Sequence, residues 1–237
     1  MNIAVIFAGG SGKRMHTKDK PKQFLLVHGK PIIVHTIERF QLHDEIDGIV
    51  VSCIEDWIPY VEEMKKRYFL DKIVAIVPGG ATGQLSIYNG LCAVEEIYGT
   101  NNIVLIHDGV RPLIDNRTIS TNIQMVKQFG SAITCKAPKE TLVLVDENEI
   151  ITEVPSREDS RCAVAPQSFW LEDILAVERA AISEGQTNMI DSCTLMRNYG
   201  KKLHAVIGPD DNIKITTPDD FYFFRSLYDV RENSQLL

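Results

Sequence analysis

Residues 3–14 have the sequence IAVIFAGGSGKR, in which a strand-like apolar run meets a cluster of glycines. An apolar run suited to a buried strand stops at Ala8, and three glycines follow within the next four positions, before two basic residues. Because glycine has no Cβ, consecutive backbone N–H groups can point into one concavity, and a helix that begins there adds the positive end of its dipole. The segment therefore predicts a phosphate-binding loop at the end of a buried strand.

Two well-known phosphate-binding motifs do not match this loop. A Walker A loop would need glycine where the chain has Phe7, and serine or threonine where it has Arg14. A dinucleotide fingerprint that starts at Gly10 would need its third glycine at Met15. The alternative is that the glycines only make a tight turn between a strand and a helix. The nearby cations Arg14 and Lys22 favour the phosphate site.

The first half of the chain alternates between helical periodicity and short apolar runs. It predicts helix 31–43, strand 48–54, helix 55–68, strand 72–77, a helix that ends at residue 98, and strand 103–107. Such alternation is typical of an α/β fold with a mostly parallel sheet covered on both faces. With no linker in its 237 residues, the chain is expected to form a single Rossmann-like domain, 1–237. Loops 8–14, 79–86 and 108–112 then lie at the carboxyl edge of the sheet, where ligands bind.

The second half breaks this alternation. A strand at 131–137 precedes a predicted hairpin, with arms at 142–145 and 149–154 around residues 146–148. Helices are expected at 171–183, at 191–199 and from residue 218 onward, with a strand at 204–207. The hairpin segment, about 137–160, has little core of its own. We expect this β-arm to project and to pack on a second copy of the chain, which predicts a homodimer.

Asp108 stands at the end of a predicted strand, beside the expected phosphate loop. Mg²⁺ prefers one or two carboxylates together with phosphate oxygens, so the residue is a candidate magnesium ligand. The alternative is a structural role, either as a helix cap or in a salt bridge with Arg111.

Composition excludes several classes of partner. The net charge of −7 argues against binding to nucleic acid or to an anionic membrane surface. No apolar run reaches the roughly 20 residues of a membrane span, and the chain enters a strand directly, which predicts a cytoplasmic protein. The five cysteines are scattered without CxxC spacing and are expected to be reduced.

Six segments of the sequence together resemble one family. In chain order they are AGGSGKRM (8–15), PKQF (21–24), GG with a following serine (79–86), HDGVRP (107–112), APQ (165–167) and NIKITTP (212–218). In this order they resemble the cytidylyltransferases that activate polyol phosphates, along the whole chain. The resemblance implies a nucleotidyltransferase fold and a reaction in which CTP and a polyol phosphate give a CDP-polyol and pyrophosphate, with Mg²⁺ as cofactor.

The resemblance also implies roles for individual residues. The catalytic cations would be Arg14, Lys22, Lys214 and Arg157. CTP would contact Ala8, Gly9, Gly10, Gly12, Gly80, Ala81, Ser86, Asp108 and Gly109. The polyol phosphate would be bound by Thr141, Arg157 and Asp191, and the metal by Asp108 and Asp211. Thr141 and Arg157 would enter the site of the neighbouring subunit, so that dimerisation would complete the active site.

The sequence departs from this family at two positions. Gly83 stands where an arginine is usual, which removes a cation, and Ile190 stands where a threonine usually precedes the aspartate. The loops at 8–10 and 79–81 resemble the ribitol-5-phosphate branch more than the 2-C-methyl-D-erythritol 4-phosphate branch. The expected substrate is therefore D-ribitol 5-phosphate. The methylerythritol substrate of isoprenoid synthesis is the alternative, and another pentitol or tetritol phosphate stays open. Rival classes are a nucleotide-binding module without turnover and a hexose-1-phosphate nucleotidyltransferase.

Overall fold

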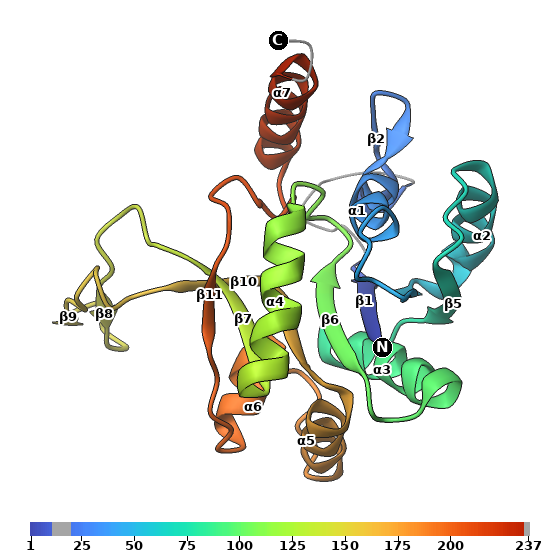
Figure 1. Cartoon of the computed structure of the whole chain (residues 1–237). Coiled ribbons are helices and arrows are strands. Elements are labelled where there is room, and N and C mark those ends of the chain that lie inside the picture. Colours follow the sequence, from blue (N-terminus) through green and yellow to red (C-terminus); the bar gives the residue numbers. More distant parts are fainter. Residues whose placement is uncertain (11–19, 235–237) are drawn as a thin grey trace.

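The computed structural model describes residues 1–10 and 20–234, and its centre is a seven-stranded sheet with the order β11-β7-β10-β6-β1-β4-β5 (Figure 1). Its strands are β1 (Asn2–Ala8), β4 (Gly48–Cys53), β5 (Ile73–Pro78), β6 (Ile103–Asp108), β7 (Ser131–Lys136), β10 (Cys162–Trp170) and β11 (Ala205–Ile207). β10 runs antiparallel to both of its neighbours, and all other pairs are parallel. The expected α/β fold with a mostly parallel sheet is confirmed.

Helices cover both faces of this sheet. The helices on one face are α1 (Ile32–Gln41), α2 (Ile58–Arg67) and α4 (Asn116–Phe129), and those on the other are α3 (Gly83–Tyr98), α5 (Leu171–Ser183) and α6 (Ser192–Asn198). The sequence of β1 shows why two layers form. Ala4 and Ile6 belong to the core of the first face, whereas Ile3 and Val5 belong to the core of the second. Successive strand residues point to opposite faces, so a continuous apolar run is buried on both sides.

Apart from the two-stranded sheet described below, the remaining elements lie outside the central sheet. They are β2 (Leu26–Val27), β3 (Lys30–Pro31), the 3-10 helices η2 (Lys22–Phe24) and η3 (Glu55–Trp57), and α7 (Pro218–Ser234). α7 extends beyond the sheet in Figure 1 and is attached through a third apolar cluster around Phe224, Ile215 and Val27. No helix in the described ranges is long and apolar enough to cross a lipid bilayer.

The strands β8 (Leu144–Val145) and β9 (Ile151–Glu153) form a separate two-stranded sheet, which lies apart from the central sheet, beyond β11, in Figure 1. Six large apolar side chains in or beside it are exposed: Val143, Leu144, Val145, Ile150, Ile151 and Val154. Apolar groups gathered on so small a sheet are suited to burial against another surface. The role of this hairpin in dimerisation stays a prediction.

The expected elements do not include α4 and β10. The signals for α4 are present, because Asp115 caps its first turn by accepting from the backbone N–H of Thr118, and Gly130 ends it in the left-handed conformation. β10 lies between β6 and β7, where its antiparallel direction follows from the return of the chain out of the β8–β9 hairpin.

Candidate active site

The loops after β1, β5 and β6 meet at the carboxyl edge of the sheet and surround a pocket of about 330 Å³, which we call the glycine pocket. Nine of the predicted site residues line it: Ala8, Gly9, Gly10, Lys22, Gly80, Ala81, Ser86, Asp108 and Lys214. Parallel strands place their carboxyl ends at the same edge, which is why loops far apart in the sequence converge there.

Two buried side chains shape the glycine loops. Gln23 donates from Nε2 to the carbonyl oxygens of Ala8 at 2.7 Å and Gly10 at 3.2 Å, and so fixes the first loop. Ser86 Oγ accepts from the backbone N–H of Gly80 at 3.0 Å and donates to the carbonyl oxygen of Thr82 at 2.8 Å. Ser86, predicted to contact CTP, therefore also holds the second loop in shape.

The two loops touch at Gly9. A Cβ built on Gly9 would lie 2.7 Å from Ser86 Oγ, closer than real Cβ atoms approach a neighbour. A side chain at position 9 would therefore have to displace the Ser86 hydroxyl, which holds the second loop.

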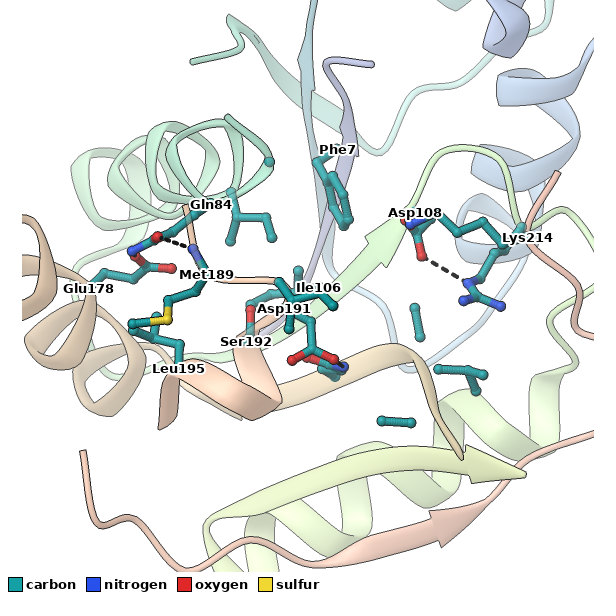
Figure 2. Close-up of a pocket in the computed structure, with 18 residues that line it drawn as sticks. Phe7, Gln84, Ile106, Asp108, Glu178, Met189, Asp191, Ser192, Leu195 and Lys214 are labelled. Carbon is teal, nitrogen blue, oxygen red and sulfur yellow. Dashed lines mark hydrogen bonds and ion pairs between the residues drawn. The ribbon is translucent and has the colours of Figure 1, made fainter. Parts of the chain in front are cut away.

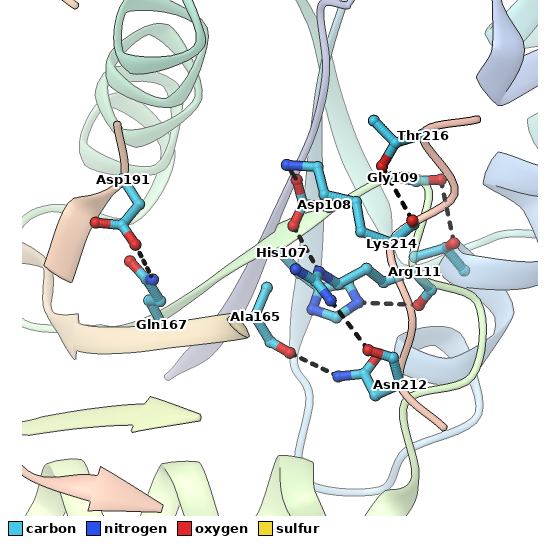
Figure 3. A network of polar contacts seen from close by, with 11 residues as sticks. His107, Asp108, Gly109, Arg111, Ala165, Gln167, Asp191, Asn212, Lys214 and Thr216 are labelled. Carbon is cyan, nitrogen blue, oxygen red and sulfur yellow. Dashed lines mark hydrogen bonds and ion pairs between the residues drawn. The ribbon is translucent and has the colours of Figure 1, made fainter. Parts of the chain in front are cut away.

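A buried cluster of charges lies at the end of β6. Asp108 accepts from Arg111 Nε at 2.8 Å and from Lys214 Nζ at 2.6 Å, one contact on each carboxylate oxygen (Figure 3). Burial alone would raise the pKa of the Asp108 carboxyl, but the charges of Lys214 and Arg111 outweigh it and hold that pKa well below its usual range. Asp108 is therefore a permanent anion that holds the Lys214 ammonium at the wall of the glycine pocket.

A network of hydrogen bonds joins this cluster to the chain around Lys214. Arg111 donates from Nη1 to the carbonyl oxygen of Asn212 at 3.0 Å, and Asn212 donates from Nδ2 to the carbonyl oxygen of Ala165 at 2.7 Å (Figure 3). His107 Nε2 lies 3.1 Å from the carbonyl oxygen of Arg111, and burial lowers the pKa of His107 to about 4, so this imidazole is neutral near pH 7. The network fixes the backbone that presents Lys214.

A second pocket of about 360 Å³ adjoins the glycine pocket, and we call it the Glu178 pocket. Four residues line both pockets: Phe7, Gly83, Asp108 and Lys214. Figure 2 shows Asp108 and Lys214 on one side of the Glu178 pocket and Gln84, Glu178 and Met189 on the other. Asp191, predicted to bind the polyol phosphate, also lines this pocket, where it accepts from Gln167 Nε2 at 3.0 Å.

Glu178 is fully buried on α5 and is expected to make stability depend on pH. Burial raises the pKa of its carboxyl from 4.5 to about 7, although a hydrogen bond from Gln84 opposes the shift. The folded state therefore holds the proton more tightly than the unfolded state. Stability conferred by the neutral carboxyl is complete below the unfolded pKa, falls as the pH rises between the two pKa values, and is lost above the folded pKa.

We expect Glu178→Gln to remove this dependence. Relative to the variant, the wild type should lose about 3 kcal/mol of unfolding free energy between about pH 4 and about pH 8. Urea unfolding at both pH values measures the difference, and Glu172→Gln, an exposed change on the same helix, is the control. Parallel pH profiles for the wild type and Glu178→Gln would contradict the expectation.

The other predicted site residues lie elsewhere or outside the described ranges. Gly109 lines neither pocket but packs beneath the first loop, where a Cβ would lie 3.1 Å from that of Ala8. Thr141 and Arg157 are exposed in the hairpin segment, where Arg157 Nη2 donates to Thr141 Oγ1 at 2.8 Å. They lie together, but away from both pockets of their own chain. Gly12 and Arg14 fall in residues 11–19, outside the described part of the chain.

The two predicted metal ligands do not lie in one cluster. Asp211 accepts from Arg231 Nη2 at 2.6 Å, whereas Asp108 is paired with Lys214 and Arg111. In the described ranges, no group of three or more His, Cys, Asp or Glu side chains is arranged to hold a metal ion. Asp108 alone could supply one carboxylate to a magnesium ion whose other ligands are phosphate oxygens and water. Its role as a metal ligand stays a prediction.

Several residues of the site were not among the predicted ones. Gln23 belongs to the PKQF motif (21–24), but nothing in the sequence indicates that its side chain holds the first glycine loop. For Arg111 the sequence suggests only a salt bridge with Asp108, and the structure shows that salt bridge. Glu178 carries a sequence signal, because a charged residue on the apolar face of a predicted helix is unusual. Its partner Gln84 is 94 residues away and cannot be paired with it from the sequence.

The fold and the two adjoining pockets, one built of glycine loops and cations, define a nucleotidyltransferase. The family model described as 2-C-methyl-D-erythritol 4-phosphate cytidylyltransferase (IspD) matches residues 2–227. The chain is 58% identical over 236 residues to the ribitol-5-phosphate cytidylyltransferase of Streptococcus agalactiae serotype V, with 100% of this chain and 98% of that protein covered. This chain therefore belongs to the IspD family of cytidylyltransferases, as its motifs predict.

Two further comparisons agree with this assignment. The chain is 37% identical over 235 residues to the 2-C-methyl-D-erythritol 4-phosphate cytidylyltransferase of Clostridium acetobutylicum, with 99% of each chain covered. The crystal structure of 4-diphosphocytidyl-2C-methyl-D-erythritol synthase from Anaerococcus prevotii matches with a TM-score of 0.84, 26% identity and 96% coverage of each chain. The nearly complete coverage shows that these proteins share the whole fold.

Proposed function

We propose that this chain transfers the cytidylyl group of CTP to D-ribitol 5-phosphate, which gives CDP-ribitol and pyrophosphate. The observation that carries the substrate is the 58% identity, over the full chain, to a protein named ribitol-5-phosphate cytidylyltransferase. The site supports the reaction class, because the glycine pocket suits a triphosphate and the Glu178 pocket opens beside it. The family description and the Clostridium acetobutylicum relative keep 2-C-methyl-D-erythritol 4-phosphate as the second candidate substrate.

The chemistry needs position and charge more than a base. A phosphate oxygen of the polyol attacks the α-phosphorus of CTP, the bond between this phosphorus and the bridging oxygen breaks, and its electron pair leaves with pyrophosphate. Negative charge grows on the oxygens around the α-phosphorus, so fixed cations aimed at them lower the barrier. Lys214 lines both pockets and is held in place by Asp108, which suits it to contact the reacting phosphates.

Other groups would complete the nucleotide site. Lys22 lines the glycine pocket, whose backbone N–H groups would bind the triphosphate, and Arg14 would add charge from the neighbouring segment. Mg²⁺, held by Asp108 and phosphate oxygens, would supply further neutralisation of the triphosphate. Asp108 fits this role as one carboxylate ligand, and Asp211 is paired separately with Arg231.

The polyol phosphate site would form between two copies of the chain. The protein would act in the cytoplasm. Thr141 and Arg157 contact each other on the hairpin segment, and neither lines the two pockets of its own chain. The exposed apolar side chains of the hairpin would be buried by a second subunit, whose Glu178 pocket would then receive the Arg157 guanidinium. A homodimer would thus have two shared sites.

Release of pyrophosphate from CTP tests this function with a panel of acceptors. We expect kcat/KM for D-ribitol 5-phosphate to exceed that for 2-C-methyl-D-erythritol 4-phosphate by at least about tenfold. The reverse order would assign the second candidate substrate. Binding of CTP without release of pyrophosphate from any acceptor would show a nucleotide-binding module, and a preference for UTP or dTTP would favour a hexose-1-phosphate enzyme.

A further inference from the structure

The Glu178 pocket contains polar side chains whose hydrogen bonds are already made within the protein. Gln84 donates to Glu178 Oε2 at 3.0 Å and to the carbonyl oxygen of Gln186 at 2.9 Å, and it accepts from the N–H of Met189 at 2.8 Å. Asp191 accepts from Gln167 Nε2 at 3.0 Å and from the backbone N–H of Thr194 at 2.7 Å. These groups form a fixed polar frame around the pocket.

Two polar atoms in the same pocket have no such partner. Glu178 Oε1 and Ser192 Oγ are buried and make no hydrogen bond to any described residue. Glu178 is 0% exposed and Ser192 is 3% exposed, and both residues line the pocket. A buried polar atom without a partner carries the full cost of its desolvation, so its persistence next to a cavity points to a partner that binds there.

The position of these two residues in the pocket suggests which part of a ligand they meet. Lys214 and Asp108 lie at the side shared with the glycine pocket, Glu178 lies at the other side, and Ser192 lies between them in Figure 2. A polyol whose phosphate lies near Lys214 would extend its carbon chain toward Ser192 and Glu178. Ile106, Ile87 and Leu195 supply apolar walls for the carbon atoms.

The geometry points to a subsite for the hydroxyl groups of the polyol that lie far from its phosphate. Ser192 Oγ and Glu178 Oε1 bind these hydroxyls and so select the length and hydroxylation of the polyol chain. The inference rests on the proposed function, since it names the part of the acceptor that this pocket binds. It assigns a specificity role to two residues that are remote from the reacting phosphates.

The test compares D-ribitol 5-phosphate with its 1-deoxy and 2-deoxy analogues, each with CTP. With the wild type, at least one analogue should have kcat/KM lowered by about tenfold to a hundredfold, because the site loses a hydrogen bond to a buried group. Ser192→Ala or Glu178→Met should lower kcat/KM for the full substrate by a similar factor. In these variants, kcat/KM should be the same for that analogue and for the full substrate. KM for CTP should stay unchanged.

The control variants are Ser183→Ala and Glu172→Met, which change exposed residues on α5. They should retain the wild-type penalty against the analogues. Ser192→Ala removes a hydroxyl that has no partner among the described residues, so the melting temperature of this variant should not fall. Ser192→Ala alone decides the question if Glu178→Met does not fold.

Several outcomes would overturn the subsite. If the wild type accepts both analogues as well as the full substrate, these two atoms bind no hydroxyl group of the polyol. If the variants lose the same factor with every acceptor, the two residues act only through the fold. Failure of the wild type to release pyrophosphate with D-ribitol 5-phosphate would remove the proposed function and the subsite together, which distinguishes that failure from the other two.

Discussion

Replacing Lys214 with alanine should lower kcat for cytidylyl transfer by about a thousandfold or more. The Lys214 ammonium lies 2.6 Å from Asp108 Oδ1 and lines both pockets, so it can act on phosphates bound on either side. The loss should appear mainly in kcat, because the charge on the phosphates grows between the ground state and the transition state. Steady-state release of pyrophosphate with saturating CTP measures the effect.

Lys201 provides a matched control for this variant. The two lysine side chains are equally exposed, at 42%, and each is paired with one aspartate, Lys201 with Asp173 at 2.9 Å. Lys201 lines neither pocket, so Lys201→Ala should keep wild-type turnover. Because Arg111 still neutralises Asp108 in Lys214→Ala, this variant should fold. Turnover within about threefold of the wild type would show that Lys214 has no catalytic role.

Mixing two inactive variants should restore activity if the site is shared between subunits. Lys22→Ala removes a cation from the glycine pocket, and Arg157→Ala removes one from the hairpin segment, so each variant alone should be nearly inactive. In a mixed dimer, one of the two sites combines the intact Lys22 of one chain with the intact Arg157 of the other. Random exchange at equal amounts should therefore restore about a quarter of wild-type activity.

The design depends on verified exchange of subunits, which native mass spectrometry of chains of different mass can show. Arg161→Ala is the control, because Arg161 is an exposed arginine just after the hairpin segment that donates to the nearby carbonyl oxygens of Glu158 and Ser160. It should be active without mixing. Mixed dimers that stay inactive would place Arg157 outside the partner's site and would contradict the proposed assembly.

The sequence predicts the parts of this molecule that local patterns determine. β1 and its glycine loop are predictable because an apolar run ends at residues without side chains, and Leu171–Ser183 forms the expected helix. The β8–β9 strands also lie within the predicted hairpin. The helix α4 could have been predicted from its caps, Asp115 and Gly130.

Contacts between distant segments are less accessible to such reasoning. The pairing of Lys214 with Asp108 depends on the route of the chain after β11, and the Gln84–Glu178 contact depends on how α3 packs beside α5. The separation of Asp211 from Asp108 likewise depends on Arg231, which α7 brings to this edge. Tertiary packing, and not local propensity, decides which polar groups become paired.

Gly83 opens α3 at the boundary between the two pockets, and a Cβ built there would meet no described atom within 4 Å. A Cβ could therefore be added at this position without displacing a described atom. Because position 83 borders both pockets, a charged residue there would change the electrostatics of both while the surrounding framework stays as it is. Under the proposed function, this single position would set the charge at the junction between the nucleotide and the polyol phosphate.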